Sequence, residues 1–224
     1  MQRNAGAWLA LVATAWLTAS CHRAAPPSPA LQQLEGRSLF TCCNLHYEKQ
    51  DINDANYWVG KLLPAGTPVR IEKTADGAVT FSAGDVQLTL THEYGTKEES
   101  FDQYLAKVLV ADDPKPRVAA YPPAVRRAIE NAKVEVGMTR AQVLLSLGYP
   151  PTHRTAGVEA REWTYWYNRW VTYKVAFDDS GKVSEVIGRP APTAEVPIPN
   201  ADAAPSASGP ANEKPKASKR HKQK

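Results

Sequence analysis

Between residues 31 and 111, apolar residues recur mainly at every second position, which is the spacing of half-buried β-strands. In the clearest case, Val86, Leu88 and Leu90 alternate with polar glutamine and threonine residues. Turn-forming residues separate such runs. The pattern predicts strands at 38–47, 67–73, 78–83 and 86–91, then an amphipathic helix with apolar residues Phe101, Tyr104, Leu105, Val108 and Leu109. We therefore expect a small, mostly-β domain over 31–111.

From residue 122 the apolar spacing becomes helical. Pro122 and Pro123 favour the start of a first helix. A second helix has Thr139 as its cap, Gln142 completing a capping box, and Gly148 as its expected C-terminal residue. The expected apolar stripe of the second helix is Val143, Leu144 and Leu147.

Alternation returns after the second helix and predicts strands at 161–167, 171–177 and 183–187. Asn168–Arg169 forms a short connection and Asp178–Gly181 a hairpin turn, so the strands form an antiparallel meander. One face of this sheet is apolar and needs the two helices as a cover. We predict an α+β fold, with a small N-terminal mostly-β domain and a C-terminal two-helix, three-stranded antiparallel meander domain over 122–188.

Residues 1–20 have one positive charge at Arg3, an apolar run and small residues before Cys21, in the manner of an export signal. The segment resembles a bacterial lipobox, which implies that Cys21 is acylated and anchors the chain in a membrane. His22 follows the cysteine where retention at the inner membrane requires aspartate, so the resemblance implies the outer membrane, facing the periplasm. Plain secretion and a retained membrane span are the alternatives.

Composition assigns the remaining segments. Residues 21–30 are a Pro-rich tether, 112–121 a linker, and 189–224 a disordered Pro/Ala/Lys-rich tail. The tail has seven Lys or Arg and three acidic residues, which accounts for the formal net charge of +4 of the whole chain. Behind an export signal, a basic tail is a solvated segment or contacts an anionic lipid or cell-wall surface. No nucleic acid partner is expected.

The sequence offers few candidate catalytic or metal-binding residues. Cys42 and Cys43 are expected to be strand cysteines on opposite faces, with a disulfide or redox role as the alternative. The acidic and amide residues of 51–56 lack the register of a calcium loop and are interpreted as a turn. His92, His153 and His221 have no partner at triad or zinc spacing. We expect no enzyme, no metal and no cofactor.

Aromatic residues crowd 163–170 more densely than one sheet face can hold. If Trp163 faces the helices, Trp166 faces outward and Trp170 lies at the turn beside Arg169. Exposed Trp and Arg are enriched at binding hot spots. We therefore predict that Trp166, Arg169 and Trp170 form a partner-binding rim, unless loops or the other domain cover Trp166.

Four features of the C-terminal segment carry a resemblance to a known family: the run Gly137–Met138–Thr139, the Leu147–Gly148 pair ahead of proline, Trp163 and the 177–183 hairpin. With these features the segment resembles SmpA/OmlA (BamE-like) outer-membrane lipoprotein domains. The resemblance covers about residues 131–188. It implies a non-catalytic accessory or scaffold subunit, with outer-membrane assembly proteins or other envelope proteins as partners. The alternative is an envelope-anchored ligand-binding or enzyme-inhibitor module, similar to β-lactamase-inhibitor proteins.

Overall fold

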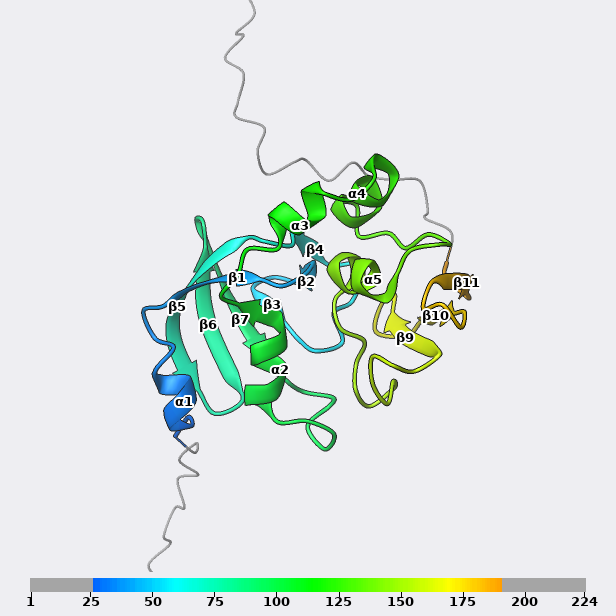
Figure 1. Cartoon of the computed structure of the whole chain (residues 1–224). Coiled ribbons are helices and arrows are strands. Elements are labelled where there is room, and N and C mark those ends of the chain that lie inside the picture. Colours follow the sequence, from blue (N-terminus) through cyan, green and yellow to red (C-terminus); the bar gives the residue numbers. More distant parts are fainter. Residues whose placement is uncertain (1–25, 191–224) are drawn as a thin grey trace, which may run out of the picture. The chain divides into compact units, whose positions relative to one another are not determined.

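The N-terminal half consists of short strands and two helices, as the computed structural model in Figure 1 shows. Their bounds are α1 (Pro29–Gln32), β1 (Ser38–Thr41), β2 (Leu45–Tyr47), β3 (Asp51–Ile52), β4 (Lys61–Leu63), β5 (Pro68–Ala75), β6 (Ala78–Ala83), β7 (Val86–Thr91), α2 (Phe101–Val108) and β8 (Leu109–Val110). Six strands form a sheet in the order β3-β7-β6-β5-β1-β8, and β2 pairs separately with β4. The pairing is antiparallel except between β3 and β7.

The structure describes residues 26–190. The predictions for the signal peptide, for Cys21 and for most of the tail lie outside the described residues. Within 26–190, no helix has both the length and the apolar content that crossing a membrane requires.

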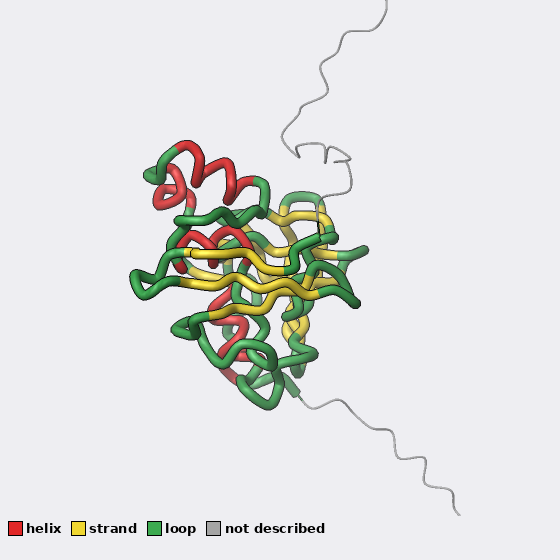
Figure 2. Tube along the Cα trace, turned by 90° about the vertical axis from the view of Figure 1, so that its right-hand side faces the viewer, coloured by secondary structure: helices red, strands yellow, loops and turns green. Residues whose placement is uncertain are grey.

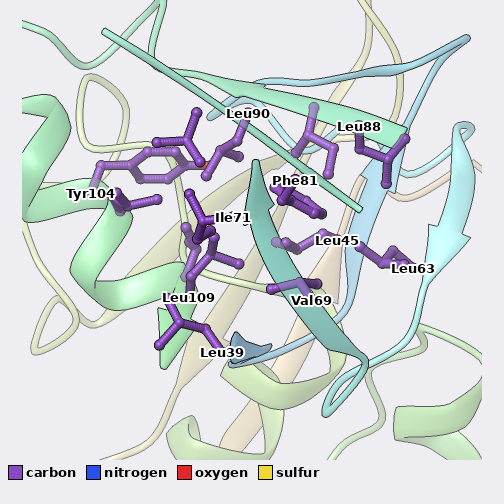
Figure 3. Packing of buried hydrophobic residues seen from close by; sticks show 14 of the residues in the cluster. Leu39, Leu45, Leu63, Val69, Ile71, Phe81, Leu88, Leu90, Tyr104 and Leu109 are labelled. Carbon is purple, nitrogen blue, oxygen red and sulfur yellow. The ribbon is translucent and has the colours of Figure 1, made fainter. Parts of the chain in front are cut away.

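Helix α2 begins at a capping box. The Ser100 hydroxyl accepts from the Gln103 backbone N–H, and the Gln103 side chain accepts from the Ser100 N–H. The buried face of the helix packs on the sheet, and Figure 3 shows Tyr104 beside Ile71 and Leu90. The predicted helix is confirmed to Val108, whereas Leu109 begins strand β8.

The predicted strand at 38–47 is wrong in its middle. Cys42 and Cys43 lie in a bend between β1 and β2, and a disulfide joins their Sγ atoms. The expectation that they point to opposite faces of one strand therefore fails, because the chain leaves the extended conformation at this point.

The C-terminal half has the predicted helix-and-meander order. Its elements are α3 (Lys115–Ala119), α4 (Pro123–Glu130), α5 (Arg140–Leu147), β9 (Glu162–Trp166), β10 (Thr172–Phe177) and β11 (Val183–Ile187). The three strands form an antiparallel sheet in the order β11-β10-β9, which Figure 2 views from the strand side with helices behind it. The predicted α+β fold class is confirmed, and the segment expected to be a linker contains α3.

Helix α5 has the predicted capping box at Thr139 and Gln142, and it ends at Gly148, which has a φ of 77°. Its predicted apolar stripe is wrong at one position, since Leu145 is buried and Leu144 is only partly buried. The reason is that the N-terminal half covers a second side of the last turn of α5. A prediction that assumes one buried helix face does not account for this second contact.

Asn44, which is 1% exposed, makes several of the hydrogen bonds between the two halves. Its backbone N–H donates to Leu145 O at 3.0 Å. Its side-chain amide donates to Ile129 O and Ser146 O, at 2.6 and 3.1 Å, and its Oδ1 accepts from the Ala65 N–H at 2.9 Å. We call Asn44 and these partners the joint, because they connect the bend after β1 to helices α4 and α5.

Candidate docking surface

The connection between β9 and β10 is a tight loop over residues 167–171. The Asn168 side-chain oxygen accepts from the backbone N–H groups of Trp170 and Val171, both at 2.9 Å. The Tyr167 N–H donates to Val171 O at 2.8 Å. A short Asn side chain that satisfies the backbone in this way fixes the loop conformation.

Trp170 is 88% exposed, the highest value for a large apolar side chain in the described part of the chain. A buried Trp would contribute substantially to folding, so this exposed ring gives the fold little of its hydrophobic energy. The loop therefore holds a large apolar surface in water in a fixed position.

Arg169 lies beside Trp170 and forms an ion pair with Glu48 of the N-terminal half, at 2.9 Å between Nη2 and Oε2. Both side chains are largely exposed, so the pair adds little to stability. Its effect is to orient the guanidinium group over the loop that follows β2.

Trp166 is less accessible than predicted, because it is only partly exposed. Its ring meets Tyr57 edge-on at 6.3 Å and stacks with His153 at 6.4 Å between centroids. The Arg154 guanidinium lies 5.3 Å from the ring. A loop residue, His153, and a residue of the N-terminal half, Tyr57, therefore cover part of Trp166, while the ring keeps some exposure.

Other aromatic residues extend this surface across both halves. The Tyr57 and Tyr94 hydroxyls are 3.0 Å apart, and Tyr94 lies 5.7 Å from His153 between ring centroids. Trp58 stacks on Tyr167 at 5.3 Å. Sequence reasoning missed Tyr57, Trp58 and Tyr94, although the adjacent pair Tyr57–Trp58 was a visible signal. We call Tyr57, Tyr94, His153 and Trp166 the aromatic cluster.

Trp58 and Val59 also lie along the edge of the C-terminal sheet. Their backbone N–H groups donate to Trp166 O and Tyr167 O, each at 3.2 Å. The Trp58 indole donates to Ala132 O at 2.8 Å. This segment of the N-terminal half therefore covers the end of strand β9 next to the rim.

The acidic and amide run at 51–56 serves the structure. Asp54 is 4% exposed, and its carboxylate accepts from the backbone N–H groups of Glu93, Tyr94 and Gly95. Asn56 has a φ of 46° and accepts from the His46 N–H at 2.6 Å. In the described part of the chain, no group of three His, Cys, Asp or Glu residues is placed to hold a metal ion.

Asp54 also contacts a histidine that the sequence did not pair with it. His92 Nε2 lies 3.4 Å from Asp54 Oδ2, and the ring stacks on Tyr104 at 5.0 Å. His92 is only 7% exposed, so the pair is not open to a substrate. The contact fixes the loop at 92–95 against the segment after β3.

His46 on β2 gives the N-terminal half a dependence on pH. Burial lowers the pKa of His46 from 6.5 to about 4. The unfolded chain therefore binds a proton between these pH values that the folded chain excludes. The part of the stability that depends on a neutral His46 is fully present above about pH 6.5 and is lost as pH falls toward 4, with a slope of up to about 1.4 kcal/mol per pH unit.

A His46→Gln variant should flatten this slope. Urea unfolding at a series of pH values between 4 and 7 measures it for both proteins. Equal slopes in the variant and the unaltered chain would show that His46 does not carry the dependence.

Two helices over a three-stranded antiparallel meander define a small α+β domain class. Residues 128–187 match the family model described as "Outer membrane protein assembly factor BamE domain". The match confirms the SmpA/OmlA-like resemblance over about a quarter of the chain and begins three residues earlier than expected. Comparisons with curated proteins and with solved structures give no match.

Proposed function

We propose that this chain is a non-catalytic accessory or scaffold subunit in outer-membrane protein assembly. The BamE-type match at 128–187 supports the assembly role. The observation that carries the docking role is Trp170, 88% exposed on a loop that Asn168 holds rigid. The free energy of burying this ring is not used in folding, so it is available when a partner covers the ring.

The proposed docking site is the rim of Trp166, Arg169 and Trp170. Trp170 supplies the apolar anchor, and Arg169 supplies a charge that can exchange Glu48 for a carboxylate on the partner. Within the aromatic cluster, Tyr57 and His153 contact the ring of Trp166 and so support the rim. The partner that fits is a folded envelope protein with an apolar pocket and an acidic residue beside it.

We further propose that acylation at Cys21 anchors the chain in the outer membrane, with the folded part in the periplasm. A multiply acylated terminus is a stable anchor, because each buried methylene contributes about 0.8 kcal/mol. The basic tail would add contact with anionic lipid or cell wall. A Cys21→Ser chain should leave the membrane fraction, and retention of that variant at the unaltered level would contradict lipid anchoring.

The rim is tested by an Arg169→Ala/Trp170→Ala variant and by a triple variant that adds Trp166→Ala. Both should lose co-purification of the envelope partner by about tenfold or more, since hot-spot residues each contribute about 2 kcal/mol or more. The double variant should keep its free energy of unfolding within about 0.5 kcal/mol, because both side chains are exposed. Cross-linking in intact cells, followed by pull-down and urea unfolding, measures the two effects.

A matched control exists elsewhere on the C-terminal half. Arg161 is 82% exposed in an ion pair with Asp179, and Val136 is 70% exposed. An Arg161→Ala/Val136→Ala variant removes one exposed arginine and one exposed apolar side chain without touching the rim. Unchanged partner recovery in the rim variants, or equal loss in this control, would refute the proposed site.

A further inference from the structure

The disulfide between Cys42 and Cys43 lies next to the joint. The Cys42 N–H donates to Val108 O of α2 at 2.9 Å, and two residues later the Asn44 N–H donates to Leu145 O of α5 at 3.0 Å. The bend that contains both cysteines therefore connects the last turn of one helix in each half. A covalent ring within this bend restricts the backbone that presents both N–H groups.

The disulfide is also reachable. Cys42 and Cys43 lie in an open groove that α2 and the segment after it form with α5, lined by apolar residues that include Leu144, Leu145 and Tyr149. Cys43 is 1% exposed, whereas Cys42 is partly exposed. Lys107, Arg117, Asp112 and Asp113 line the same groove, so charges of both signs surround the disulfide.

We propose that Cys42–Cys43 is a reversible redox site, acted on by a dithiol reductant or dithiol protein, whose disulfide state holds the joint rigid. A thiolate of the dithiol attacks Cys42 Sγ, the Sγ–Sγ bond breaks, and Cys43 leaves as a thiolate that takes up a proton. The second thiol of the dithiol then attacks the first sulfur of the same dithiol, which is bonded to Cys42 Sγ in the mixed disulfide. This step releases Cys42 as a thiol. Two electrons and two protons pass to the chain, and the dithiol becomes a disulfide.

The reduced state keeps the core. A buried Cys43 thiol is a small apolar side chain and needs no new partner. What changes is the bend, which regains backbone freedom next to Cys42 and Asn44. The two halves then remain folded while the hydrogen bonds that join them open more often, so the site tunes the joint without unfolding either sheet.

The oxidation state is read from one peptide. Trypsin cleaves after Arg37 and Lys49, so Ser38–Lys49 contains both cysteines and excludes Cys21. The full chain is isolated from an oxidising compartment and treated with iodoacetamide under denaturing, non-reducing conditions. It should give this peptide without alkylation, and with a mass two hydrogen atoms below that of the peptide with two free thiols. Two alkylated thiols, or a cross-link to another peptide, would overturn the proposal.

The consequence for the joint is read by hydrogen exchange. Reduction of the folded chain with dithiothreitol should speed exchange of the Cys42 and Asn44 N–H groups about tenfold, the effect of weakening roughly one hydrogen bond, while Val175 in the central strand β10 stays unchanged. A Cys42→Ala/Cys43→Ala chain should exchange at the faster rate with and without dithiothreitol. Equal hydrogen-exchange rates in the oxidised and reduced chains, or a dithiothreitol effect that persists in this variant, would overturn the proposed redox control of the joint.

Discussion

Replacing Asn44 with alanine should lower the free energy of unfolding by about 3 kcal/mol or more, because each buried polar group left without a partner costs about 1–3 kcal/mol. The substitution removes the side-chain donor to Ile129 O and Ser146 O and the acceptor of the Ala65 N–H. Water cannot easily replace these contacts, since Asn44 is 1% exposed. Urea unfolding, followed by tryptophan fluorescence, measures the loss.

Asn131→Ala is the matched control. The Asn131 side chain also donates to a backbone carbonyl, Arg127 O at 2.6 Å, but it is exposed. Its loss should change the free energy of unfolding by about 0.5 kcal/mol or less. If both variants lose the same amount, the joint is no more important than a surface hydrogen bond.

Replacing Trp163 with alanine should lower the free energy of unfolding by about 3–5 kcal/mol, the range for a fully buried aromatic residue. Trp163 is 0% exposed, and its ring lies 4.5 Å from that of Phe177 between centroids. The indole Nε1 has no hydrogen-bond partner, so the cost comes from lost packing and the cavity that remains. Thermal or urea unfolding measures it directly.

Trp170→Ala is the same chemical change in the loop between two strands of the same sheet. Because Trp170 is 88% exposed, this variant should unfold within about 0.5 kcal/mol of the unaltered chain. A large loss for Trp170→Ala would mean that the ring packs in solution and is not available for docking.

The elements with strong local signals could be predicted from sequence. The capping boxes at Ser100 and Thr139 fix where α2 and α5 begin, and residues 86–91 alternate along their whole length. These signals depend on neighbours within a few residues, which the sequence displays directly. The same holds for the loop at Asn168, whose side chain bonds its own backbone.

What could not be predicted depends on contacts between distant residues. Strand β1 pairs with both β5 and β8 just before the bend at Cys42, and Leu145 O accepts from Asn44, about a hundred residues earlier. The aromatic density of 163–170 indicates the proposed rim, but the cover on Trp166 comes from Tyr57 and His153. No local pattern in 163–170 reports on either residue.

The hydrogen bonds from Trp58 and Val59 to the end of β9 have a consequence for copies of this protein held close together. Open strand edges invite neighbouring chains to add to the sheet and start aggregates. Here the chain blocks part of one such edge with its own backbone, immediately beside the surface that it presents to solvent. The protein can thus expose a large indole ring at high local density while lowering the risk of polymerising through that end of the sheet.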